Sequence, residues 1–175
     1  GTVYLWSNDD SHKKVLSTRS NGDFAISIAI DNATLLTLAL PDGKTIPLFA
    51  EPGTTATLQP DSILKSGWHV RGGRTQALHD SISRLLDATD NPDRQKKIIN
   101  GFIDKHPKSE VAVELYHRYL LDIPKPDNDY LRKKITKLSG TLQDHRYFVA
   151  TTKRLEKKTG NIKHRMFPTF NYTTA

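Results

Sequence analysis

The chain has 175 residues, of which 36% are hydrophobic and 26% are charged, and its formal net charge is +7. This composition is typical of one globular domain or two small ones, and no apolar run approaches the roughly 20 residues that a membrane-spanning helix needs. Cysteine is absent, which excludes disulfides, thiolate metal sites and cysteine nucleophiles within the chain.

Residues 1–73 have the alternating apolar pattern of β-strands. In residues 23–30 the side chains of Phe24, Ile26, Ile28 and Ile30 fall on one face. Further strands are predicted at residues 2–6, 34–40, 45–50, 55–58 and 68–72. Asp42-Gly43 lies between two apolar runs, which predicts a hairpin. Short strands separated by turns indicate a small antiparallel β-sandwich or barrel.

Residues 74–160 have helical periodicity instead. Thr75 is expected to cap the first helix, which carries apolar residues on one face. Further helices are predicted to begin at Pro92, Ser109, Asp127 or Asn128, and about Gln143, and the last ends before Gly160. The sequence therefore predicts an α+β chain, with an all-β domain at 1–73 and a bundle of about five helices at 74–160.

Charge is divided unevenly between these two parts. Residues 1–73 hold six basic and seven acidic residues, whereas residues 74–175 hold twenty basic and twelve acidic residues. The basic stretches at 94–97, 132–134 and 153–158 suggest a self-contained binding module for an anionic glycan or another polyanion. Solvated helix faces are the simpler interpretation, and the absence of an aromatic ladder disfavours nucleic acid as a partner.

No residue pattern predicts catalysis, a cofactor or a metal. The seven histidines form none of the spacings of a metal site. His117 beside Glu114 suggests a proton-transfer pair, although a surface contact is the commoner role for this helical spacing. Gly72-Gly73 before a helix is similar to an anion-binding helix start, and an interdomain turn is the alternative. Trp6 and Trp68 offer sugar-stacking surfaces or, more often in strands, core residues.

The last residues form an aromatic, uncharged run. We expect residues 161–175 to be a linker followed by a strand. The candidate interdomain interface consists of four residues of that strand: Phe167, Pro168, Phe170 and Tyr172. Pro168-Thr169-Phe170 resembles the entry into thioredoxin-like domains of the membrane-tethered type. On this interpretation the strand is the first one of a missing thioredoxin-like domain. The start at Gly1 leaves room for a removed signal or lipid anchor.

The rest of the chain extends this resemblance. Residues 1–73 resemble an uncharacterised all-β domain found upstream of thioredoxin-like domains in Bacteroidetes cell-envelope proteins. The matching residues are 21–26, 46–53 and 70–73. Residues 74–160 are similar to the helical spacer of the same proteins, with counterparts to "FIDKHPKSEVAVELYHRYLL" and "LSGTLQDHRYFVATTKRLEKKTG".

The resemblance implies a role without chemistry in this chain. The parent protein would be a thiol–disulfide oxidoreductase of the cell envelope, periplasmic or a membrane-tethered lipoprotein, whose paired cysteines lie in the next domain. No position here matches those cysteines, so no catalytic residue is carried over. The implied partners are that thioredoxin-like domain, a protein client, or a second copy in a homodimer.

Overall fold

A computed structural model of the chain describes residues 1–7, 11–138, 142 and 145–160. Within these residues it contains two antiparallel sheets and five α-helices, so the predicted α+β fold class is confirmed. The chain divides into two compact units, a first unit, Gly1–Ile98, and a second unit, Ile99–Ala175.

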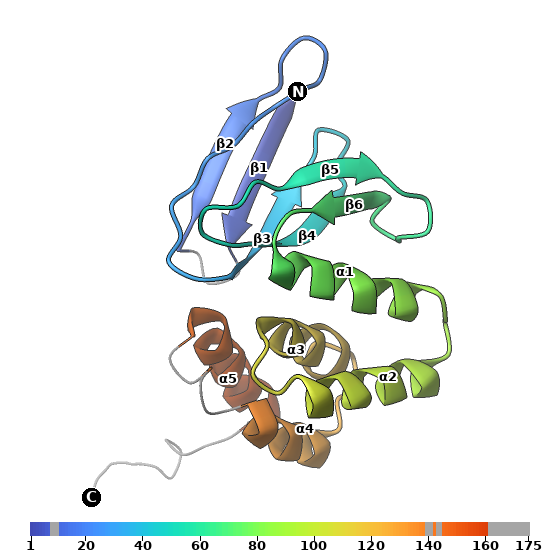
Figure 1. Cartoon of the computed structure of the whole chain (residues 1–175). Helices are drawn as coiled ribbons and strands as arrows, with labels where there is room; N and C mark the ends of the chain where they lie inside the picture. Colours follow the sequence, from blue (N-terminus) through green and yellow to red (C-terminus); the bar gives the residue numbers. More distant parts are fainter. Residues whose placement is uncertain (8–10, 139–141, 143–144, 161–175) are drawn as a thin grey trace, which may run out of the picture. The chain divides into compact units, whose positions relative to one another are not determined.

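The first unit contains both sheets (Figure 1). A four-stranded sheet has the order β2-β1-β3-β4, and β5 pairs with β6 in a two-stranded sheet. All pairs are antiparallel. The strands are β1 Thr2–Ser7, β2 Lys13–Ser17, β3 Thr34–Ala39, β4 Thr45–Ala50, β5 Thr57–Pro60 and β6 Trp68–Arg71. The predicted hairpin is present, since Ala39 pairs with Thr45 across a turn in which Gly43 has a φ of 86°.

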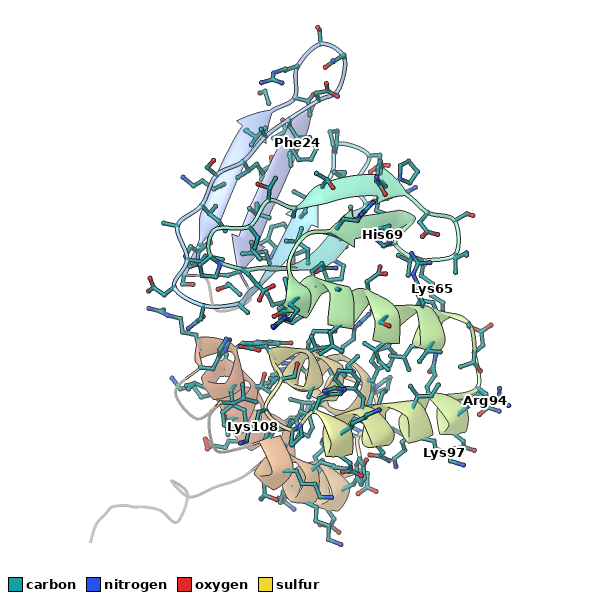
Figure 2. All side chains as sticks on the ribbon, viewed as in Figure 1. Phe24, Lys65, His69, Arg94, Lys97 and Lys108 are labelled. Carbon is teal, nitrogen blue, oxygen red and sulfur yellow. The ribbon has the colours of Figure 1, made fainter. Side chains whose placement is uncertain are left out.

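One hydrophobic core joins the two sheets into a sandwich. Alternate residues of β1, β3 and β4 point from one face of the larger sheet and are buried together with Val70 of β6. Leu58 of β5 and Trp68 of β6 pack against the same core. Phe24, labelled in Figure 2, covers this core from the segment that follows β2.

One strand prediction was wrong, and one strand was not predicted. Residues 24–30 alternate between half-buried and exposed as predicted, but they pair with no strand in the described part of the chain. The strand of this region is instead β2, whose lysines and single exposed valine give it a weak strand pattern. Pairing depends on which chain lies alongside, and the periodicity of one segment does not contain that information.

Helix α1, Arg74–Asp87, packs against β4 of the larger sheet and against β6. Phe49 alternates out of the sandwich core, is fully buried, and meets the ring of His79 edge-on at 5.3 Å between centroids. The Phe49 backbone N–H donates to the Gln76 side-chain oxygen at 2.6 Å. At Phe49, strand β4 is therefore buried also on the face that points away from the sandwich core. Helix α1 belongs to the first unit together with the strands.

The second unit is helical. The division between the units falls within α2, Pro92–Lys105, and the second unit continues with α3 Glu110–Leu115, a π-helical turn Tyr116–Leu121, α4 Asn128–Ile135, a 3₁₀ turn Thr136–Leu138, and α5 Arg146–Thr159. Ser109 caps α3 as predicted, since its side chain accepts from Val111 N–H. Of the two residues predicted to begin α4, Asp127 is the cap, since its side chain accepts from Tyr130 N–H. Gly160 ends α5 in the left-handed conformation.

Candidate functional site

The most developed polar feature of the first unit is the junction between the sheets and α1. We call Glu51, Gly72, Gly73 and Thr75 the strand–helix joint. Gly73 is the N-cap of α1 and provides no side-chain cap. Glu51, which directly follows β4, supplies one instead: its carboxylate accepts from the Thr75 N–H and the Thr75 hydroxyl, each at 3.0 Å. Thr75 therefore lies within the first turn, and the predicted capping role for it was wrong.

The two glycines of the joint have no room for a side chain. A Cβ on Gly73 would overlap the Glu51 carboxylate, and one on Gly72 would overlap the backbone of Thr55 and Ala56. Both residues have positive φ, 86° and 139°. The resemblance of this stretch to an anion-binding helix start thus has a physical basis. The anion at this helix end is the carboxylate of Glu51 from the same chain.

A second polar feature, the Arg84 cluster, consists of Asp61, His69, Asp80 and Arg84. The Arg84 guanidinium donates to Asp80 at 3.0 Å and to Asp61, and its nitrogen lies 2.7 Å from His69 Nδ1 (His69 is labelled in Figure 2). The hydrogen bond from Arg84 holds the pKa of Asp61 below its usual value. The cluster joins the β5–β6 turn, β6 and α1, and its one guanidinium contacts both carboxylates.

Sequence patterns find only half of this cluster. Asp80 and Arg84 are four residues apart on one helix face, which predicts their ion pair. Asp61 and His69 come from a turn and a strand, and no spacing rule brings them to the helix. A carboxylate that a guanidinium keeps ionised is a poor proton donor, so the arrangement favours a structural tie over acid–base chemistry.

In the second unit, Glu114 and His117 have separate partners. Glu114 has a side chain only 4% exposed and accepts two hydrogen bonds from Arg118, at 2.7 and 2.8 Å. His117 Nδ1 lies 3.1 Å from the Thr151 hydroxyl of α5, and the His117 ring stacks on Tyr147. Burial lowers the pKa of His117 below 6.5 and so favours its neutral form. These contacts tie the π-helical turn to α5.

The basic stretches divide into paired and exposed residues. Lys134 is nearly buried and shares one Asp104 oxygen with Lys137, each at 3.1 Å. Arg154 pairs with Asp122 at 2.8 Å. Three exposed residues remain together on α5: Arg146, Lys153 and Lys157. Spacings of seven and four residues put them on one helix face, which we call the α5 basic face.

The tryptophans differ in environment. Trp68 packs against the sandwich core, which agrees with the core role expected for a strand tryptophan. Trp6 is half-buried in β1, where it lies opposite Lys13 of β2 and Thr37 of β3. The two side chains therefore belong to different surroundings within the first unit.

The remaining predictions concern the end of the chain, metal sites and membrane spans. The predicted interface residues Phe167, Pro168, Phe170 and Tyr172 lie outside the described residues. Within the described ranges, no group of three His, Asp or Glu side chains is placed to hold a metal ion. The helices described here are also too short or too polar to cross a bilayer.

The polar features described above share one property. In the joint, the Arg84 cluster and the Glu114–Arg118 pair, each charged group is bound by a group of opposite charge or by backbone donors of the same unit. Such arrangements hold the joined elements in position. Comparison with family models, with curated proteins and with solved structures finds no match to this chain.

Proposed function

We propose that this chain is a non-catalytic accessory region of a cell-envelope thioredoxin-like protein. In this role it positions the oxidoreductase domain or engages the protein clients of that domain. The proposal rests on the resemblance of residues 21–26, 46–53 and 70–73, together with the helical spacer pattern. The sequence contains no cysteine, so thiol–disulfide exchange would take place on the neighbouring domain.

The observation that carries the proposal is the strand–helix joint. Two of the three matching stretches meet there, since Glu51 belongs to residues 46–53 and the two glycines belong to residues 70–73. Residues that carry the resemblance thus fix the angle between a sheet and a helix. Residues that fix a sheet against a helix are expected in a spacer or a docking surface. If the resemblance came from a shared catalytic site, the matching residues would include reactive side chains.

The test begins with the native coding sequence beyond Ala175. A continuation of about a hundred residues with a Cys-x-x-Cys pair supports the proposal, and a stop codon at that point overturns it. If the domain is present, reduction of a disulfide-bonded client is compared in the whole protein and in a form without residues 1–160. Equal client reduction by both forms would contradict a role of residues 1–160 in client binding. Positioning of the oxidoreductase domain would then remain as their role. Cell fractionation tests the envelope location.

A second candidate function is binding of an anionic glycan or another polyanion. The observation that favours it is the α5 basic face, where three exposed cations lie on one side of the helix. Retention on immobilised heparin should then fall steeply with salt. The double variant Lys153→Gln with Lys157→Gln should elute earlier than the natural chain. The control variant Lys14→Gln with Lys44→Gln loses the same charge from the first unit and should be retained longer than the α5 variant. Equal retention of the two variants would reject this site.

A further inference from the structure

Residues 24–30 are an extended apolar segment without a backbone partner. Their burial alternates, with Phe24, Ile26 and Ile28 packed against the sandwich core and the residues between them exposed. In the described part of the chain, the backbone groups of residues 24–28 and of Ile30 have no hydrogen-bond partner. The one backbone contact is that of the Ala29 carbonyl with His12 Nε2, at 3.0 Å. Strand-forming residues with an unpaired backbone offer the same N–H and C=O groups as the edge strand of a sheet, and we call this segment the open edge.

The open edge has a defined side. In an extended strand, the N–H and C=O of one residue point to the same side, and alternate residues point to opposite sides. Since the Ala29 carbonyl faces His12, the backbone groups of Ala25 and Ser27 point to that side too. The groups of Phe24, Ile26, Ile28 and Ile30 point to the other side, where they are available to an added strand.

The remaining edges of the first unit are protected and this one is not. Strand β2 carries Lys13 and Lys14, β4 contains Pro47, and β5 ends in Pro60. Strand β6 has four residues and ends in Arg71. Charges, prolines and short length are the usual protection against pairing between molecules. Residues 24–30 contain neither a charge nor a proline.

The sequence of the segment is complementary to itself. Residues 25–29 read Ala-Ile-Ser-Ile-Ala, which is the same in both directions. In an antiparallel pair centred on Ser27, Ile26 would lie opposite Ile28, and Ala25 opposite Ala29. The outer pair would be Phe24 with Ile30, so every inward position stays apolar and every outward position stays small. A two-fold interface requires this kind of self-complementarity, in which each residue pair occurs twice.

We infer that two copies of this chain associate through antiparallel pairing of residues 24–30 across a two-fold axis at Ser27. The hydrogen bonds run through the backbones of Phe24, Ile26, Ile28 and Ile30, whose groups face the open side. Ser27 is then a non-hydrogen-bonded pair with its own copy. Each copy keeps its inward side chains on its own core. This inference does not depend on the thioredoxin-like neighbour.

Single cysteines provide a direct test, because the natural chain has none. At a non-hydrogen-bonded pair the Cα atoms lie about 4.5 Å apart, which a disulfide can bridge. Under mild oxidation Ser27→Cys should therefore form a covalent dimer. Ala25→Cys is the matched control. In this register residue 25 lies opposite residue 29 of the second copy, so the two cysteines are four residues apart along the strand, roughly 13 Å, and should stay uncrosslinked. Equal crosslinking of the two variants overturns the inference.

A charge pair tests the register without covalent chemistry. Positions 25 and 29 are exposed, so both variants keep the core intact, and thermal unfolding verifies this. Ala25→Lys with Ala29→Lys places like charges opposite each other, whereas Ala25→Lys with Ala29→Glu places opposite charges there. Sedimentation equilibrium should give a dimer dissociation constant at least about tenfold higher for the first variant. Equal constants, or a monomeric natural chain up to millimolar concentration, would overturn the inference and leave this edge for a strand from another protein.

Discussion

The carboxylate of Glu51 accepts hydrogen bonds from both the backbone N–H and the hydroxyl of Thr75, each at 3.0 Å. The helix cap that Gly73 does not provide thus comes from a residue more than twenty positions earlier in the chain. This places the end of β4 and the start of α1 in a fixed relation. It also satisfies a backbone N–H of the first helical turn, which has no partner within the helix.

Removal of this cap should destabilise the first unit. We expect Glu51→Ala to lower its free energy of unfolding by about 1–2 kcal/mol, the usual cost of losing a side-chain cap. Both tryptophans, Trp6 and Trp68, lie in the first unit, so tryptophan fluorescence during urea unfolding reports on this unit alone. Glu156→Ala on α5 is the control and should leave the fluorescence transition unchanged.

The Glu51 effect should also depend on Thr75. Thr75→Val removes the hydroxyl that donates to Glu51 Oε2. In the double variant the loss of stability should be smaller than the sum of the two single losses, because both changes break the same contact. Strict additivity would show that Glu51 acts through some other group.

The glycines of the joint should differ sharply from a glycine in an open turn. Gly72→Ala forces a Cβ into the backbone of Thr55 and Ala56 at a positive φ, so we expect a loss of more than about 2 kcal/mol. Gly53 also has positive φ, 73°, but has open space around it. Gly53→Ala should therefore cost only about 1 kcal/mol. Similar losses in fluorescence-detected urea unfolding would contradict the close packing at Gly72.

The fold class and most element positions could be predicted from local pattern. The apolar runs gave β1, β3, β4 and β6, and Asp42-Gly43 gave the β3–β4 hairpin, because turn chemistry and alternation are local properties. The cap at Ser109 was found for the same reason, and Asp127 was one of the two residues predicted to begin α4. These signals need no knowledge of the rest of the molecule.

The failures involve residues whose role depends on distant neighbours. Residues 24–30 have the alternation of a strand but lack a partner, whereas β2 has a weak pattern and gains its place by pairing with β1. Thr75 looks like a cap in the sequence, yet Glu51 takes that role from another element. In the Arg84 cluster, Asp61 and His69 reach α1 only through the tertiary fold.

Titration of His117 should make the second unit less stable in mild acid. Burial lowers its folded-state pKa below 6.5, so as the pH falls the unfolded chain takes up this proton first. Its contribution is fully present above about pH 6.5 and is lost as the pH falls toward the folded-state pKa, with a slope of at most about 1.4 kcal/mol per pH unit.

The matched variant for this titration is His117→Asn, which keeps a polar group near Thr151 but does not titrate. Helical circular dichroism during urea unfolding, between pH 7.5 and pH 5, should show a smaller pH slope for the variant than for the natural chain. The other histidines contribute equally to both proteins. Identical slopes would mean that the His117 pKa is the same in the folded and unfolded states.

Alkaline titration should separate buried from exposed tyrosines. Burial raises the pKa of Tyr116 and of Tyr147 well above 10, because the charged phenolate would lose its solvation. The Tyr116 hydroxyl also donates to the Leu131 carbonyl at 2.8 Å, a bond that the phenolate cannot make. Both groups therefore contribute stability that is present below about pH 10 and is lost as the pH rises further.

Ultraviolet absorbance of tyrosinate measures this directly. We expect a first phase near the ordinary tyrosine pKa of about 10, followed by a second phase that coincides with the loss of helical circular dichroism. Tyr116→Phe and Tyr147→Phe should each reduce the amplitude of the second phase, because each variant removes one of the two buried phenols. If the second phase preceded unfolding, solvent would reach these phenols in the folded unit, which would contradict close packing of the π-helical turn against α4 and α5.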